Sequence, residues 1–201
     1  YMAPPGWGRV YVKVAGNFTY EKWVEGVKLG RSFVSNGPVV EFSVNGAEPG
    51  GSVALDGPGV VKLKGKLRSA YPIERLEVIF NGRVMAAGEL DADRTGGTLD
   101  TEVELPESGW LALRAAGKPV QFWWGREHGA HTNPVYVNVR GKPQPVAASA
   151  RYFLEWIDRL EKDLQVRDRI PEGERADVAR HLDLARSVYR SKLKSAGVPI
   201  R

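Results

Sequence analysis

Short runs in which apolar and polar residues alternate fill the first two thirds of the chain. A period of two predicts β-strands, because successive side chains of a strand point to opposite faces. Gly, Pro, Asn and Asp separate the runs, and no helical pattern occurs between Ser35 and Arg140. We expect strands over residues 9–14, 39–44, 60–67, 75–80, 83–87, 98–105, 110–115, 120–124 and 135–140. Such regular short strands predict an antiparallel, immunoglobulin-like β-sandwich, since a parallel sheet would need helices between its strands.

Two local signals refine this picture near its start and its middle. Asn81-Gly82 lies between two of the alternating runs. This dipeptide favours a tight β-hairpin, because both turn residues must accept a positive φ. Near the N-terminus, Thr19 precedes apolar residues at helical spacing, and Gly30 follows them. A short capped helix is therefore expected before the first sandwich strand.

The period changes after the linker-like segment 141–145. Two apolar stripes then recur at helical spacing, the first made of Phe153, Trp156, Ile157, Leu160 and Leu164, the second of Val178, Leu182, Ala185, Tyr189 and Leu193. Pro171 suits the first turn of the second helix, and Gly197 and Pro199 end it. The two stripes predict a helical hairpin whose apolar face must pack against another surface, either the sandwich or a further domain of the parent protein.

The expected fold class is thus mainly β, an immunoglobulin-like sandwich with a short N-terminal strand–helix segment and a C-terminal α-helical hairpin. Residues 1–34 form the first segment, 35–142 the sandwich and 143–201 the hairpin. No run of about 18 apolar residues occurs, so no membrane partner is expected. The first residues show no signal peptide, and a chain that begins with Tyr1 is expected to be a piece of a longer protein. The compartment of that parent stays open, a secreted or periplasmic one included.

The amino-acid composition excludes only a few classes of function. The chain is 42% hydrophobic and 26% charged, as in an ordinary globular protein. It has no cysteine, which excludes disulfides, thiol nucleophiles and cysteine-ligated zinc. The net charge is +5, but acids and bases are mixed throughout. The most basic run, residues 62–68, alternates as a strand with its charges on the solvent face, so no nucleic-acid partner is expected.

His128 and His131 are the candidate metal ligands. They flank Gly129-Ala130 and follow Glu127, and zinc sites commonly use two close histidines with a third ligand from elsewhere. The alternative is that they are loop residues that lead into the strand at 135, because Gly129 and the following Asn-Pro favour a loop. His181 lies among charged residues and is expected at the surface.

Tryptophans raise one further possibility, an aromatic platform for a sugar ring. Trp123 and Trp124 are adjacent in a predicted strand, so they point to opposite faces and cannot both line one flat surface. One of them is expected in the core and the other at an edge or interface, and a core role is favoured over a sugar platform, which Trp110 also suggests. No nucleophile-elbow or phosphate-loop motif occurs. No catalytic residue and no bound cofactor are therefore predicted for this chain.

A family resemblance adds a second kind of expectation. The run 23–38, WVEGVKLGRSFVSNGP, resembles a late stretch of PHP-type (polymerase and histidinol phosphatase) metal-dependent hydrolases, in their carbaryl-hydrolase-like branch. Residues 8–12 look like the strand that precedes it. Residues 130–137, AHTNPVYV, resemble the last strand of the C-terminal β domain in that family, and 110–114 are similar as well.

The resemblance implies an accessory domain that follows a catalytic barrel. Residues 1–34 would be a remnant of that barrel, whose His, Asp and Glu ligands for a divalent metal lie upstream and have no counterpart here. The barrel would be the main partner, with Arg31 in an ion pair with it and Asn36 as a second domain contact, while the oligomeric state stays open. Two other functions remain: a stand-alone carbohydrate- or protein-binding module, and a small metal-dependent enzyme centred on His128 and His131.

Overall fold

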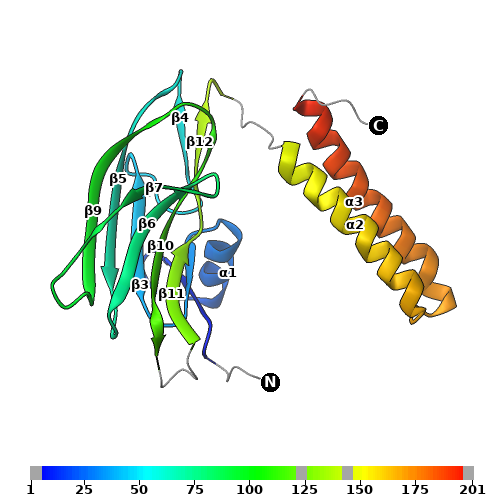
Figure 1. The fold of residues 1–201 in the computed structure, drawn as a ribbon, viewed down its shortest axis with the longest axis horizontal. Coiled ribbons are helices and arrows are strands. Elements are labelled where there is room, and N and C mark those ends of the chain that lie inside the picture. The colour runs from blue at the N-terminus through cyan, green and yellow to red at the C-terminus, as the bar shows by residue number, and fades with distance from the viewer. Residues whose placement is uncertain (1–5, 121–125, 142–146, 197–201) are drawn as a thin grey trace. The chain divides into compact units, whose positions relative to one another are not determined.

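The computed structural model describes residues 6–120, 126–141 and 147–196. It divides into two compact units, residues 1–143 and 144–201. The first unit holds two β-sheets and one helix, and the second holds two long helices (Figure 1). The chain is therefore mainly β, as the alternating runs predict.

The larger sheet is built around a long central strand, β10 (Gly109–Val120). On one side β10 pairs with β6 (Ile73–Phe80), which continues through a hairpin into β7 (Arg83–Ala87). On the other side it pairs with β11 (Arg126–Thr132) and β12 (Val135–Val139). The remaining strands are β2 (Ser32–Ser35) and β1 (Arg9–Val12), which extend the sheet from β11, and β4 (Ser52–Leu55), which pairs with β12.

The smaller sheet has four strands in the order β3-β5-β9-β8. They are β3 (Val39–Val44), β5 (Gly59–Arg68), β9 (Gly96–Leu105) and β8 (Glu89–Leu90). Every strand pairing of the described residues is antiparallel except that of β12 with β4. The β1–β2 end of the larger sheet and β3 of the smaller sheet are both edges, and edge strands need either cover or a device that discourages pairing.

The two sheets share one apolar core. Alternate residues of β5 point inward, and Val61 and Leu63 are fully buried. Leu111 and Leu113 on β10 are fully buried in the same cluster. Gly65 makes room for this contact, since a Cβ there would lie 3.1 Å from a methyl group of Leu113. Packing of this kind gives each sheet one buried and one solvent face, which is why the period-two pattern is so clear in the sequence.

The structure differs from the sequence prediction in several strands. Residues 126–132 form β11 and not a loop, because they pair with the preceding strand β10 and with β2, which is distant in sequence. Gly129 helps here, since a Cβ would lie 2.8 Å from the carbonyl oxygen of Ala115 on the neighbouring strand. β2, β4 and β8 were not expected, and the predicted strand 120–124 lies, apart from Val120, outside the described residues. The expected division after residue 34 falls inside β2.

The helices of the described residues match the predicted stripes. α1 (Tyr20–Lys28) begins after Thr19, whose Oγ accepts a hydrogen bond from the backbone N–H of Lys22. α2 (Ala147–Arg167) and α3 (Arg175–Ser195) are antiparallel and contact each other along their length. The 3₁₀ turn η2 (Glu172–Glu174) follows Pro171 and leads into α3.

Candidate interaction site at the N-terminal edge of the larger sheet

Helix α1 packs on the outer face of the larger sheet through a glycine. Gly26 is the one buried residue of α1, and a Cβ there would overlap a methyl group of Val12 on β1. Residues of a strand two apart share a face, so Val10 lies on the same face as Val12. The glycine therefore lets the helix backbone approach β1 closely, while the larger side chains of α1 point elsewhere.

Apolar side chains around α1 are left in solvent. We call this set the N-terminal apolar surface and define it by six residues with their exposed fractions: Val10 (47%), Phe18 (71%), Tyr20 (70%), Val27 (40%), Leu29 (44%) and Val34 (38%). The ring of Tyr20 stacks on that of Trp23, at 6.4 Å between centroids. An amphipathic helix normally buries its apolar stripe, so the exposure of α1 indicates a surface that is incomplete by itself.

A row of cross-strand neighbours continues this surface along the sheet. Val10 pairs with Val34, and Val34 pairs with His131 on β11. His131 in turn lies opposite Arg114 on β10, whose guanidinium donates to Glu77 at 2.7 Å. Residues directly opposite in adjacent strands lie on the same face. The two exposed valines are thus bordered by an imidazole and an ion pair, a polar rim beside an apolar centre.

On the other face of the same edge lies a cleft of about 440 Å³ between β1, β2 and β3. Tyr11 and Phe33 stack inside it with ring centroids 4.8 Å apart and planes within 8°. Lys13 and Glu48 form an ion pair at its border. The cleft combines flat aromatic rings with charged groups, which suits the binding of a small amphipathic ligand or an extended peptide.

Arg31 lines this cleft with an exposed side chain. Its backbone is fixed on both sides, because its N–H donates to the carbonyl of Gly26 and its carbonyl accepts from the N–H of Lys13, each at 2.9 Å. Its guanidinium makes no hydrogen bond or ion pair with any residue that the structure describes. The predicted ion pair with a separate barrel stays a prediction, and the guanidinium is placed where such a partner could reach it.

Asn36 is already engaged within its own unit. Its Nδ2 donates to the carbonyl of Glu127 at 3.0 Å, and its Oδ1 accepts from the N–H of Gly129 at 2.7 Å. Its backbone N–H donates to the carbonyl of Gly129 as well. The side chain therefore extends the β2–β11 ladder by one step, so the structure gives Asn36 a role in holding these strands together.

The structure separates the two candidate metal ligands. His128 is 2% exposed, whereas His131 is exposed, because residues three apart on β11 point to opposite faces. The Nδ1 of His128 lies 2.9 Å from the carbonyl oxygen of Lys118, and its Nε2 has no partner among the described residues. The ring of Tyr71 meets its edge at 6.0 Å. The histidines do not converge on one ion, and no group of three His, Asp or Glu in the described parts of the chain could hold a metal.

The other candidate residues are easily placed. His181 lies exposed on α3, with Nδ1 2.7 Å from the carbonyl of Asp177, which confirms a surface position. Trp110 is half-buried on β10, and its backbone N–H donates to Oδ1 of Asn81. Trp123 and Trp124 lie outside the described residues.

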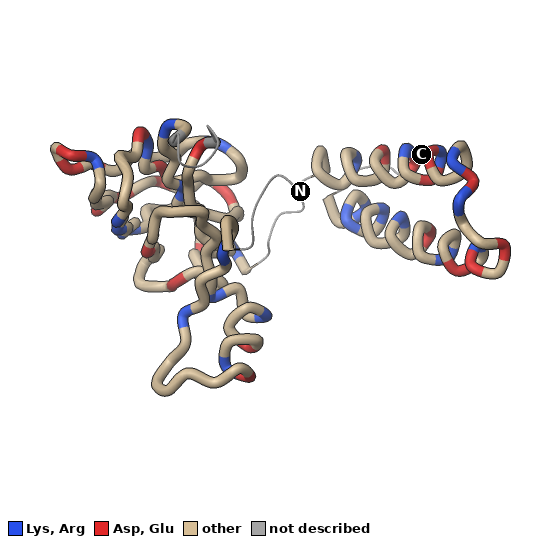
Figure 2. Tube along the Cα trace, turned by 90° about the horizontal axis from the view of Figure 1, so that it is seen from below, with Lys and Arg blue, Asp and Glu red and all other residues tan. Residues whose placement is uncertain are grey.

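Charges on the outer face of the smaller sheet are largely compensated. The lysines of β5 alternate with buried residues, as predicted, and lie beside the acids of β9. Asp100 lies 3.5 Å from Lys62 and 3.8 Å from Lys64. Figure 2 shows basic and acidic residues interspersed in both units. This face therefore has no uniform basic stripe of the kind that tracks a phosphate backbone.

No helix in the described segments is long and apolar enough to cross a membrane. No protein-family model matches the chain, and no curated protein matches it.

Proposed function

We propose that this chain is a non-catalytic accessory domain, an immunoglobulin-like β-sandwich with a helical tail, of a PHP-type metal-dependent hydrolase. It packs on the catalytic barrel through the N-terminal apolar surface and supports it. The observation that carries the proposal is the exposure of apolar side chains on and around α1. Val27, Leu29 and Val34 of that surface belong to the run 23–38 that resembles the barrel-closing stretch of these hydrolases.

The energetics of this surface favour a permanent contact. Phe18 and Tyr20 each expose about 70% of their surface, and covering both removes on the order of 300 Å² from water. At about 25 cal/mol per Å² this corresponds to about 7 kcal/mol before the costs of association. In a single polypeptide those costs are small, because the barrel and this domain are covalently linked.

The same proposal assigns different roles to the barrel and to this domain. The divalent metal and its His, Asp and Glu ligands belong to the barrel, and the accessory domain contributes no catalytic residue. Arg31 and the cleft beside it lie at the edge that would meet the barrel, where they border the path of a substrate. His131 and the Arg114–Glu77 ion pair supply a polar rim to the contact.

A second function, a stand-alone immunoglobulin-like carbohydrate- or protein-binding module, is favoured by one observation. The stacked rings of Tyr11 and Phe33 line the cleft next to Lys13 and Glu48, and the guanidinium carbon of Arg9 lies 5.9 Å from the centroid of the Tyr11 ring. Aromatic rings beside charged groups suit a polar ligand with an apolar face, such as a sugar ring. Loss of glycan binding in a Tyr11→Ala variant would favour this reading over the first.

The coding sequence upstream of Tyr1 tests the leading proposal most directly. We expect a barrel domain with several His and Asp motifs there, and an upstream region without one overturns the proposal. In the longer protein, Phe18→Ser combined with Tyr20→Ser is expected to lower the unfolding temperature of the barrel and its metal-dependent hydrolysis. The matched control is Val60→Ser, a change at a 57% exposed valine on the outer face of β5, which is expected to do neither.

Two further measurements test the Arg31 ion pair and the alternative of a small metal-dependent enzyme. Arg31→Ala in the longer protein is expected to reduce stability or activity, and an unchanged protein would remove the ion-pair hypothesis. Elemental analysis of the chain described here addresses the third function. Stoichiometric zinc, iron or manganese bound to it would favour a small metal-dependent enzyme instead.

A further inference from the structure

The helical hairpin of the second unit is thinly packed. In α2 and α3 together, Ala150 and Leu193 are the only buried residues. Half-buried side chains and Phe153 make most of the contact between the two helices, which we call the seam. The ring of Phe153 stacks on that of Tyr189 with 4.9 Å between centroids. Two helices alone cannot bury an apolar stripe on more than the facing side, so a second apolar face must find its cover elsewhere.

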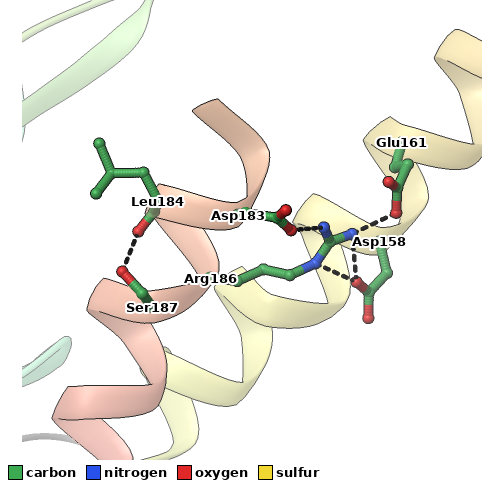
Figure 3. A network of polar contacts seen from close by, with 6 residues as sticks. All are labelled: Asp158, Glu161, Asp183, Leu184, Arg186 and Ser187. Atoms are coloured by element: carbon green, nitrogen blue, oxygen red, sulfur yellow. Dashed lines mark hydrogen bonds and ion pairs between the residues drawn. The ribbon is translucent and has the colours of Figure 1, made fainter. Parts of the chain in front are cut away.

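One flank of the hairpin is held together by charges. Arg186 on α3 is 12% exposed and donates to Asp158 at 3.1 Å and to Glu161, both on α2 (Figure 3). Asp183 on its own helix completes the cluster at 3.2 Å. Asp158 and Arg186 therefore mark the same flank of the antiparallel pair.

The opposite flank is apolar. Successive helical residues are rotated by about 100°, so Trp156 and Asp158 lie on opposite sides of Ile157, a residue of the seam. On α3, Leu184 and Arg186 lie on opposite sides of Ala185 in the same way. Figure 3 shows Leu184 directed away from the side on which Arg186 reaches α2. Trp156 and Leu184 thus share the flank that the charged cluster does not occupy.

Five exposed side chains form this surface, which we call the hairpin apolar flank. Its members and their exposed fractions are Tyr152 (57%), Trp156 (54%), Leu160 (48%), Leu184 (63%) and Val188 (47%). Those on α2 recur at intervals of four residues, as do those on α3, which places each set along one side of its helix. The rings of Tyr152 and Trp156 stack at 6.5 Å, so the aromatic part of the flank is pre-arranged.

The size of the flank matches what a pair of copies needs. Each of its five side chains exposes on the order of 100 Å², which gives roughly 500 Å² per copy and about 1,000 Å² for two. Interfaces between copies are about 65% apolar, so the polar rim brings the total to roughly 1,500 Å², the size of a standard specific interface. A single small ligand could not cover this area.

The surroundings of the flank also suit an identical partner. Towards the turn of the hairpin its charged residues are already paired within one copy, Arg167 with Asp163 at 2.9 Å and Arg180 with Asp177 at 3.1 Å. A neutral, internally paired margin does not repel a second copy. It also lacks the uniform charge that would select an acidic or basic partner.

We propose that the hairpin apolar flank is the contact between two copies of this chain, which pair through their hairpins as a two-fold symmetric four-helix bundle. A symmetric pairing buries the same side chains twice, and a four-helix bundle is the architecture in which two antiparallel hairpins complete a common core. Trp156, the middle one of the three flank residues on α2, is the residue on which the contact depends most. This inference stands independently of the hydrolase proposal.

Sedimentation equilibrium of the full chain tests the proposal. We expect a species of twice the 22.2 kDa chain mass and expect Trp156→Asp to raise the dissociation constant roughly 100-fold or more. The matched control is Val166→Asp, a change on the same helix at a 76% exposed valine outside the flank, which leaves the dimer unchanged. A monomer at about 100 µM, or a dimer that Trp156→Asp leaves intact, overturns the proposal.

Cysteine cross-linking keeps the test decisive if Trp156→Asp does not fold. The chain has no cysteine of its own, so Leu160→Cys and Leu184→Cys each introduce a single reactive thiol on the flank. A short bis-maleimide is expected to link two copies of either variant, but not two copies of Val166→Cys. Equal cross-linking of all three variants would also overturn the proposed contact.

Discussion

A clash between one glycine and one buried histidine provides the sharpest test of the packing described above. Gly117 lies on β10 at an irregularity in its pairing with β6 and β11. A Cβ at this position would lie 2.5 Å from Nε2 and 2.9 Å from Nδ1 of His128. Distances this short do not occur between real atoms, so Gly117→Ala must displace the imidazole.

The imidazole has little freedom to move. Its Nδ1 is held 2.9 Å from the carbonyl of Lys118, the ring of Tyr71 lies against it, and the side chain is 2% exposed. Overpacking a site of this kind costs about 1–3 kcal/mol, and breaking the hydrogen bond to Lys118 adds about 1 kcal/mol. We therefore expect Gly117→Ala to lower the free energy of unfolding by about 2–4 kcal/mol.

Removing the ring removes the clash, because the three atoms nearest to the new Cβ all belong to the imidazole of His128. His128→Ala alone is expected to cost about 2–4 kcal/mol through the cavity it leaves. In that background Gly117→Ala should be neutral or stabilise by about 0.5 kcal/mol, the usual gain when glycine is replaced in a strand. The double-mutant cycle thus predicts a coupling of at least about 2 kcal/mol between the two positions.

Urea unfolding followed by tryptophan fluorescence measures this coupling, since five of the six tryptophans belong to residues 1–143. Gly57→Ala is the matched control, because nothing lies within 4 Å of a Cβ there, and its effect should stay within about 0.5 kcal/mol. If Gly117→Ala costs as much without the imidazole as with it, the glycine is not there to accommodate His128 and the reasoning is wrong.

Three other changes address the hairpin, a turn and the crossing between the sheets. Arg186→Met removes all of its ion pairs at once and should cost the hairpin about 1–2 kcal/mol, seen as a lower melting temperature of the helical circular dichroism. Hydrogen bonds from the backbone N–H and the hydroxyl of Thr95 lower the pKa of Asp93 below its ordinary value of 3.8. The folded state therefore gains stability above that pH and loses it as the pH falls through the lower folded pKa. Asp93→Asn should remove this part of the pH dependence of the urea midpoint. Gly88→Ala places a Cβ 2.7 Å from a methyl group of Leu76, where the chain passes from one sheet to the other, and should cost about 1–3 kcal/mol in chemical denaturation.

Strands with a local cause were predictable from the sequence. The β6–β7 hairpin follows from Asn81 and Gly82, which adopt φ values of 47° and 85° in the structure. The alternation of β5 follows from a sheet with one face in the core. β11 was missed because its glycine and histidines carry no strand signal of their own. Its partners are residues 114–120 of β10 and 33–35 of β2, and neither pairing is visible in the local pattern.

The candidate site was predictable only in part, for a related reason. Periodicity identifies the apolar face of a helix but does not reveal whether another element covers it. The stripe that includes Val27 predicted α1 correctly, yet Val27 is 40% exposed. The distance between His128 and His131 in sequence left both a metal site and a loop open, and only the strand geometry of β11 sets their side chains on opposite faces.

The N-terminal apolar surface is carried by a fully formed helix that is fixed to the sheet. α1 is complete as a helix, with Thr19 capping its start and the N–H of Gly30 bonded to the carbonyl of Val27 at its end. It is fixed to β1 through Gly26. Its exposed apolar side chains are thus held on a formed scaffold, so a partner that covers them would not have to order the backbone first. An uncovered β1 edge next to these side chains would favour aggregation, and a covalently attached barrel that packs on both would remove that liability.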